Sequence, residues 1–339
     1  MRAPDQTPYH FLAIIHPSPT IRSVPQTLPN PQAQVHATPR SSATSRSFDA
    51  PAPLRLWHLT SLDAPTVAVV WTLAFAWAAG IRLPAWIPGL LALTAWAVYI
   101  ADRLLDARAA MARGDLGSLR ERHLFHHRHR RLLIPVAALA ASAAACIVFT
   151  LMPAPARERN SLLACAALLY FTTVHSESVP STGNRLSFSS ARLFRKELLV
   201  GVLFTAACAL PTLSRVWIAH LTAPFPLLAA ALIFSLLAWL NCHAIDRWED
   251  ARSKVCAGRH KGIARPACLL ASAASVLAVS MASSQPRLAA LLAAAAASSL
   301  LLALLDQLRP QLTPLALRAL ADLVLLTPLI LLVPAALRP

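Results

Sequence analysis

Long apolar stretches separated by short polar breaks make up most of the chain after residue 63. Their positions predict helices at about 64–80, 84–105, 132–152, 160–175, 197–213, 222–245, 265–283, 287–305 and 315–337. A helix rises about 1.5 Å per residue and needs about 20 residues to cross a bilayer. The pattern therefore predicts an all-α fold, a polytopic membrane helical bundle of about nine transmembrane helices.

The first 60 residues follow a different pattern. They hold ten of the 27 prolines, many serines and threonines, and five arginines, but only two acids, Asp5 and Asp49. We expect residues 1–60 to be a disordered Pro/Ser/Arg-rich segment, and residues 61–339 to form the transmembrane domain. A transit peptide and a start codon assigned too far upstream are the alternative explanations for such a beginning.

Composition supports lipid as the solvent of the second region. Hydrophobic residues make up 56% of the chain and charged residues 14%, and the mean hydropathy is +0.54. Soluble domains carry about 25% charged residues. These values exclude a soluble enzyme, a disulfide scaffold and a disordered protein as descriptions of the whole chain.

The net charge of +16 is distributed unevenly along the chain. Of the 31 Lys and Arg residues, 25 fall in the N-terminal segment and in the breaks after predicted helices 2, 4, 6 and 8. The intervening breaks hold the other six. Positive charge marks the cytoplasmic side of a membrane protein. We therefore expect a cytoplasmic N-terminus and no nucleic-acid partner.

A short motif occurs twice, 144 residues apart. The sequence D-R-x-x-D-A-R spans residues 102–108 and 246–252, at the ends of the second and sixth predicted helices. Both ends fall on the predicted cytoplasmic side. An internal repeat in a membrane protein predicts two related halves.

The spacing within the motif predicts a carboxylate site. Residues i and i+4 share one face of a helix, so Asp102 and Asp106 can face one point. Asp246 and Asp250 can face the same point from the other repeat. Carboxylate oxygens suit Mg²⁺, which commonly shares phosphate ligands with them. The alternative is that each motif ends its helix in solvated salt bridges.

This arrangement resembles the UbiA superfamily of intramembrane prenyltransferases, nine-helix proteins with aspartate-rich motifs at the cytoplasmic ends of helices 2 and 6. Asp102 and Asp106 match the last two aspartates of the family's N-D-x-x-D-x-x-x-D motif. Asp246 and Asp250 match its D-x-x-x-D motif. The leading Asn-Asp of the first motif is replaced by Val98-Tyr99.

The resemblance implies a Mg²⁺-dependent membrane transferase whose active site faces the cytoplasm. It would move an isoprenyl group from a prenyl diphosphate to a lipophilic, aromatic acceptor, with the four matched aspartates as catalytic and metal-binding residues. Basic residues after helix 4 bind substrate in the family, which implies this role for Arg195 and Lys196. The further candidates for diphosphate binding are Arg103, Arg247, Tyr99 and His243.

Several alternatives stay open. A catalytically inactive UbiA-like membrane protein that binds lipids or partners is favoured by the Val98-Tyr99 replacement. An ion-coupled transporter would also use intramembrane carboxylates, and a CDP-alcohol phosphotransferase would carry its aspartates in one contiguous motif. The loop with His123, His126, His127 and His129 is interpreted as a basic lid or headgroup-binding face, with a metal site as the alternative.

Overall fold

The computed structural model describes residues 48–112, 114, 119–176, 189–219, 225–253 and 262–336. Within these ranges the chain is helical and contains no strand beyond one isolated bridge, Phe48 to Leu312, which confirms the all-α prediction. The helices are α1 (Ala52–Leu59), α2 (Asp63–Ala78), α3 (Trp86–Ala112), α4 (Glu121–Arg128), α5 (Arg130–Thr150), α6 (Ala154–Ser176), α7 (Ser189–Ala219), α8 (Phe225–Ser253), α9 (Ala264–Met281), α10 (Pro286–Leu308), α11 (Pro314–Leu323) and α12 (Leu329–Ala336), with short 3-10 turns at Arg309–Gln311 (η2) and Val324–Leu326 (η3).

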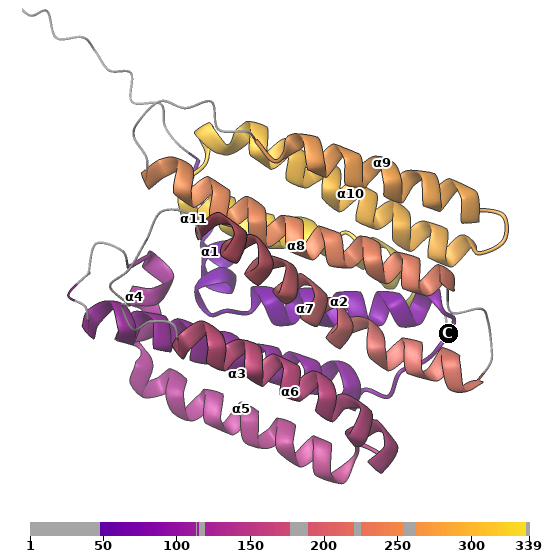
Figure 1. The fold of residues 1–339 in the computed structure, drawn as a ribbon, viewed down its shortest axis with the longest axis horizontal. Helices are drawn as coiled ribbons and strands as arrows, with labels where there is room; N and C mark the ends of the chain where they lie inside the picture. Colours follow the sequence, from indigo (N-terminus) through magenta and orange to yellow (C-terminus); the bar gives the residue numbers. More distant parts are fainter. Residues whose placement is uncertain are drawn as a thin grey trace, which may run out of the picture. The chain divides into compact units, whose positions relative to one another are not determined.

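The long helices run alternately up and down one bundle (Figure 1). The C-terminal ends of α3 and α8, which carry the two copies of the repeat, lie at the same end of this bundle. The short helices α1, α4 and α11 lie at that end too, and we call it the repeat end. The predicted arrangement of the two motif copies on one side is thus present in the fold.

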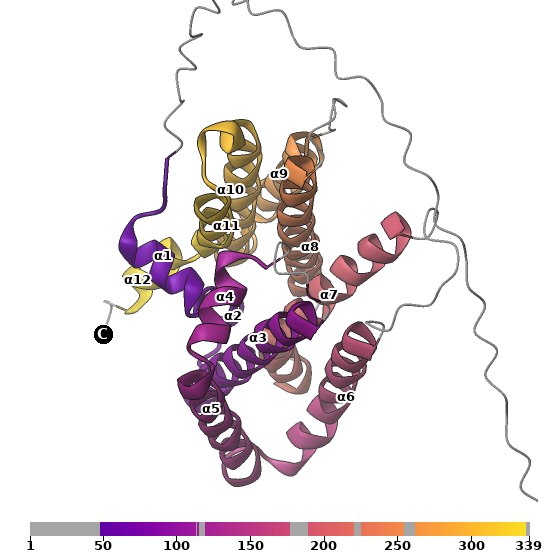
Figure 2. The same cartoon turned by 90° about the vertical axis from the view of Figure 1, so that its left-hand side faces the viewer.

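The central packing is between α2, α7 and α8. The indole of Trp71 on α2 stacks on the ring of Phe234 on α8 with centroids 3.8 Å apart, and Phe75 meets the same ring edge-on. All three side chains are fully buried. The pairs α9–α10 and α3–α5 flank this centre, and seen along the helices they lie on opposite sides of it (Figure 2). The middle of the bundle therefore holds its apolar core.

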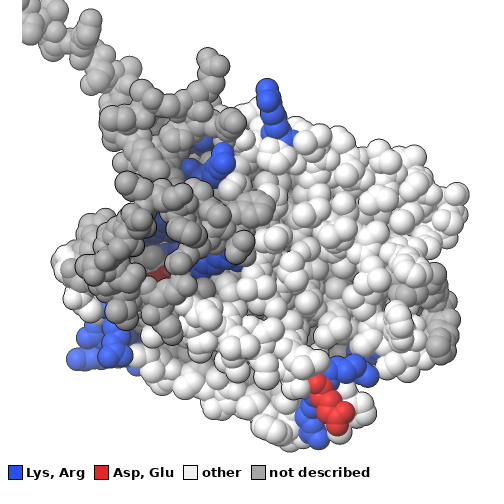
Figure 3. All heavy atoms as spheres, in the orientation of Figure 1, with Lys and Arg blue, Asp and Glu red and all other residues white. Residues whose placement is uncertain are grey.

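Six helices of the described ranges are long and apolar enough to cross a membrane: α3, α5, α7, α8, α9 and α10. A seventh crossing results if α1 and α2, which meet at an angle of 89°, are counted as one bent span. On the face drawn in Figure 3, charged side chains lie toward the ends of the helices and leave a broad stretch without charged residues between them. These features are those of a multi-pass membrane protein.

The predicted helices can be compared with the observed ones directly. Each of the nine predicted ranges has a helical counterpart, but not each counterpart qualifies as a span. α6 begins with the charged run 157–159, and the last predicted helix is broken into α11, a 3-10 turn and α12. Residues 1–47 of the predicted disordered segment lie outside the described residues. The helical part begins at Ala52 with α1, before the predicted boundary at residue 61.

The bend between α1 and α2, which we call the elbow, exposes backbone groups that need partners in an apolar setting. Ser61 turns the chain with a positive φ of 59°. The indole of Trp96 on α3 donates to the Thr60 carbonyl at 2.9 Å, and Arg103 on α3 donates to the His58 carbonyl at 3.2 Å. Two side chains of α3 thus fix the elbow on the bundle.

α7 and α8 approach each other closely at Gly201. A methyl group at this position would lie 2.9 Å from the Ser235 carbonyl oxygen and 2.9 Å from the Trp239 backbone nitrogen. Both are backbone atoms of α8 and cannot turn aside. Small residues permit such close contacts between membrane helices. The contact matters for function because Gly201 also lines the cavity described below.

We predict that Gly201→Ala pushes α7 and α8 apart and lowers the free energy of unfolding by about 1–3 kcal/mol, the usual cost of overpacking. Gly89→Ala is the matched control, because a methyl group on Gly89 in α3 meets nothing within 4 Å. It should stabilise the protein by about 0.4–1 kcal/mol. Thermal unfolding in detergent measures both, and equal effects of the two variants would contradict the close contact.

Candidate functional site

The repeat end of the bundle contains a cavity of about 200 Å³. Its walls come from the elbow, α3, α4, α7, α8 and α11, so segments from both halves of the sequence enclose it. The ionisable side chains that line it are His58, Asp63, Tyr99, Asp102, Arg103, Arg122, Cys242, Asp246, Arg318 and Asp322. A cavity bounded by this many charged groups is a candidate site for a charged ligand.

The leading aspartates of the two repeats meet in this cavity. Asp102 lines it from α3 and Asp246 lines it from α8. Both carboxylates also act electrostatically on the hydroxyl of Tyr170 on α6. Asp246 shares a hydrogen bond with Glu197, a buried residue of α7. The structure thus places the leading aspartates of both repeats on the wall of one cavity.

The second aspartates of the repeats are placed differently. Asp106 is exposed on α3, and its Oδ2 lies 3.9 Å from Nε2 of His123 on α4. The side chain of Asp250 lies outside the described residues. Among the described side chains of the repeats, the aspartates that line the cavity are therefore Asp102 and Asp246.

Of the candidate diphosphate-binding residues, two line the cavity, and the others with described side chains do not. Tyr99 and Arg103 line the cavity, and the guanidinium of Arg103 lies over the Tyr99 ring, 5.8 Å from its centroid. His243 faces α7, where its Nδ1 lies 2.7 Å from Oε2 of Glu197, and its ring stacks on Trp239. Arg247 and Lys196 are exposed. The side chain of Arg195 lies outside the described residues.

Three arginines face the cavity, one each from α3, α4 and α11. Burial lowers the pKa of Arg122 well below its usual value, and the nearby positive charges of Arg318 and Arg103 lower it further. Burial also lowers the pKa of Arg318, while Glu249 opposes this shift. These shifts mean that positive charge is crowded against this wall, and a bound anion would relieve it.

α4 contributes Arg122 to the cavity wall and is fixed by polar contacts. Arg120, just before α4, pairs with Glu249 of α8, and Glu249 also pairs with Arg318 of α11. At the other side, Arg55 of α1 pairs with Glu121. Glu249 thus joins three separate segments through one carboxylate that is 21% exposed.

His126 fixes the buried side of α4. Its Nδ1 lies 2.8 Å from the Arg122 carbonyl and its Nε2 lies 3.1 Å from Oγ of Ser61 at the elbow. A neutral imidazole satisfies both contacts, with Nδ1–H as donor and Nε2 as acceptor of the serine hydroxyl. Burial, together with the positive charges of Arg103 and Arg122, lowers the pKa of His126 to about 4. The histidine is therefore neutral at pH 7.

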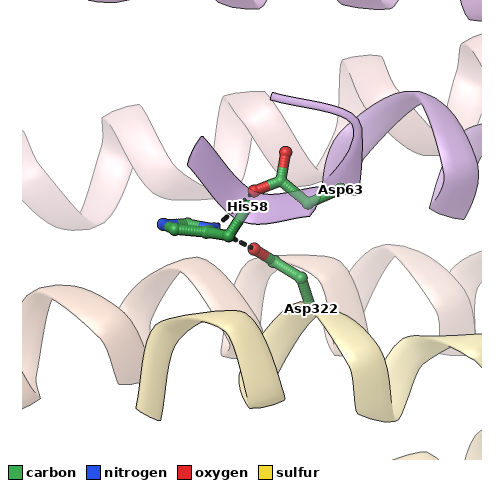
Figure 4. Close-up of side chains that lie close together, drawn as sticks. All are labelled: His58, Asp63 and Asp322. Atoms are coloured by element: carbon green, nitrogen blue, oxygen red, sulfur yellow. Dashed lines mark ion pairs between the residues drawn. The ribbon is translucent and has the colours of Figure 1, made fainter. Parts of the chain in front are cut away.

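One part of the site has no counterpart among the predicted residues. His58, Asp63 and Asp322 meet at the wall formed by the elbow and α11 (Figure 4). Burial and the charge of Asp63 raise the pKa of Asp322 to about 7. These are single ionisable residues beside apolar stretches, without a repeat or recognisable spacing. The sequence signal that could have identified them is that ionisable residues in or beside membrane helices are often functional.

Asp306 positions the end of α8 from α10. Its Oδ1 accepts a hydrogen bond from the indole of Trp248 at 2.8 Å, and its Oδ2 accepts one from the Ala264 amide at 3.1 Å. Trp248 lies inside the second repeat, two residues after Asp246. Asp306, which has no motif around it, therefore positions the helix that presents Asp246.

Comparison of the chain with protein-family models, with curated proteins and with solved structures finds no match. The structure by itself supports the class of α-helical multi-pass membrane proteins.

We predict that Glu249→Gln loosens α4. The change leaves Arg120 and Arg318 without their shared carboxylate, and losing the partner of a partly buried charge costs about 1–3 kcal/mol. Hydrogen exchange of the α4 amides should speed up. Glu121→Gln is the matched control, because the Arg55–Glu121 pair is about half exposed and such pairs contribute about 0–1 kcal/mol. Equal exchange rates in the two variants would contradict the role of Glu249.

We predict that acidification destabilises the protein through His126. A histidine whose folded pKa is about 4 binds fewer protons when folded than when unfolded, where the pKa is about 6.5. Its stabilising contribution is complete above pH 6.5 and decreases by about 1.4 kcal/mol per pH unit down to pH 4. Unfolding measured between pH 7.5 and 5 should show a smaller slope in His126→Gln. His129→Gln, at an exposed position, should keep the wild-type slope.

Proposed function

We propose that the protein is a UbiA-like prenyltransferase, which transfers an isoprenyl group from a prenyl diphosphate to a lipophilic, aromatic acceptor. The observation that supports this most strongly is that Asp102 and Asp246, the leading aspartates of two sequence repeats, line one cavity. The proposal includes nine membrane crossings in two related halves, a cytoplasmic N-terminus and a cavity that faces the cytoplasm. The 25 basic residues on the predicted cytoplasmic side support this orientation.

The donor set of the cavity fits Mg²⁺. Asp102 and Asp246 offer hard oxygen ligands from two helices that line the cavity, and Mg²⁺ commonly takes one or two carboxylates together with water and phosphate oxygens. When bound, Mg²⁺ would supply positive charge that stabilises the diphosphate leaving group. Asp102 and Asp246 would hold it in the proposed site, and Glu197 shares a hydrogen bond with Asp246.

The three arginines of the cavity serve the anionic part of the donor. Arg103, Arg122 and Arg318 would bind the diphosphate and stabilise the charge that develops when the allylic C–O bond breaks. The electron pair of that bond leaves with the diphosphate. The acceptor forms the new bond to the isoprenyl carbon and releases a proton. α4 covers this region and limits the access of water to the cation.

The cavity volume limits what fits inside. A volume of about 200 Å³ is below the roughly 300–1,000 Å³ of sites that enclose a drug-sized ligand. It suits the diphosphate headgroup, so the apolar chain of the donor would extend between the helices. Phe204 on α7 and Tyr99 on α3 line the cavity and offer ring faces to a cation.

One observation favours the second candidate, a catalytically inactive UbiA-like protein that binds lipids or partners. Val98 is 51% exposed, and the Tyr99 ring lies under the guanidinium of Arg103. Neither residue offers a carboxylate at the position where the resembled family has one. Such a cavity would hold a diphosphate lipid without cleaving it.

We predict that the purified protein releases diphosphate from farnesyl or geranylgeranyl diphosphate when Mg²⁺ and an aromatic acceptor lipid are present. Asp102→Asn and Asp246→Asn should each lower the rate at least about 100-fold, because even residues behind metal ligands contribute about 10–100-fold. Glu158→Gln, an exposed carboxylate on α6, is the control and should change the rate less than about 3-fold.

The same samples separate the two candidates. Mg²⁺-dependent binding of the prenyl diphosphate without diphosphate release would support the inactive, lipid-binding protein. Equal rates in wild type, Asp102→Asn and Asp246→Asn would contradict the enzyme, and absence of binding in wild type would contradict both candidates.

A further inference from the structure

The elbow and α11 bring three ligand-type atoms together in a buried place. Nδ1 of His58, Oδ2 of Asp63 and Oδ2 of Asp322 all lie within 4.8 Å of one another. Both carboxylates point at the imidazole ring (Figure 4). His58 is 2% exposed and Asp63 is 1% exposed, so bulk water does not solvate these atoms. The three residues belong to three separate helices, α1, α2 and α11.

Two of these atoms are paired only imperfectly. His58 Nδ1 and Asp63 Oδ2 are 2.7 Å apart and form a buried ion pair, but their alignment is poor for a hydrogen bond. Arg103 approaches Asp63 Oδ2 only to 3.6 Å, and it donates instead to the His58 carbonyl. Buried polar atoms without partners are uncommon and costly. A ligand that accepts electron pairs from both atoms would remove this cost.

The remaining oxygens of the two carboxylates are already occupied. Asp63 Oδ1 accepts a hydrogen bond from the Ala64 amide at 2.9 Å, and Asp322 Oδ1 accepts one from Nδ2 of Asn241 at 3.1 Å. Each aspartate is therefore oriented by one oxygen and presents the other to His58. Metal ligands are commonly oriented by hydrogen bonds of this kind.

We propose that His58 Nδ1, Asp63 Oδ2 and Asp322 Oδ2 bind a divalent transition-metal ion such as Mn²⁺ or Zn²⁺. One imidazole nitrogen with two carboxylate oxygens suits such an ion better than Mg²⁺, which prefers oxygen alone. Two ligand atoms that each lie about 2.1 Å from the same metal ion lie roughly 3 Å from each other. The separations of 2.7 Å and 3.8 Å from His58 Nδ1 lie on either side of this value.

The local charge is compatible with a dication. When both are ionised, Asp63 and Asp322 supply two negative charges, and Arg103 offsets one of them. Arg318, the other cation near Asp322, is paired with Glu249. The ion would join α1, α2 and α11 at the wall of the cavity, separate from Asp102 and Asp246. Its presence does not depend on the proposed transfer reaction.

The test uses the full-length protein in detergent micelles, stripped of metal and then loaded with Mn²⁺. Pulsed electron paramagnetic resonance detects the ¹⁴N nucleus of an imidazole bound to Mn²⁺. We expect this nitrogen coupling in wild type, its loss in His58→Gln, and its retention in His129→Gln, an exposed histidine of the same protein end. The Asp102→Asn/Asp246→Asn double variant should also retain it, which separates this site from the Mg²⁺ site of the proposed function.

A second variant keeps the result independent of the folding of His58→Gln. Asp322→Asn should weaken Mn²⁺ binding at least about 10-fold, with a thermal unfolding profile that shows a folded protein. The proposal is overturned if wild type shows no nitrogen coupling, if the coupling persists in His58→Gln, or if folded Asp322→Asn binds Mn²⁺ as wild type does. None of these readouts measures diphosphate release, so each hypothesis can fail separately.

Discussion

The cost of holding charge away from water determines how the repeat end of the bundle is built. Four carboxylates and three guanidiniums line one cavity of an otherwise apolar bundle. Removing one such charge from water costs several kcal/mol unless other groups compensate it. Arg318 therefore pairs with Glu249 on α8, and Arg103 donates to the elbow carbonyl of His58. These contacts tie together helices that are far apart in sequence, and they fix the positions of the site residues.

Apolar runs were sufficient to locate the long helices, because the run length needed to cross a bilayer is set by lipid thickness. They could not reveal α4 (Glu121–Arg128), which is polar and charged. Its helical structure depends on tertiary contacts such as His126 with Ser61 and Arg120 with Glu249. The break after Leu323 was equally invisible, since the residues on both sides of it are apolar. Helix propensity and hydropathy do not contain these long-range contacts.

The candidate site, like the fold, could be predicted only in part from the sequence. The repeat identified Asp102 and Asp246, because two copies of a motif at equivalent helix ends must face related surroundings. It also suggested that Asp106 shares the site, but one helical turn carries Asp106 about 6 Å further along α3, toward His123. His58 and Asp63 are five positions apart across a bend, and Asp322 follows some 260 residues later. Only the three-dimensional fold brings them together.

The charge balance of the cavity also bears on what it can bind. Tyr99 stands where the resembled family has a carboxylate, so four carboxylates instead of five face three guanidiniums. A bare anion would be attracted by Arg103, Arg122 and Arg318 but repelled by Asp102 and Asp246. A ligand that combines an anionic group with a divalent cation meets both sets of residues with opposite charges. The magnesium-bound diphosphate of the proposed function would have this composition.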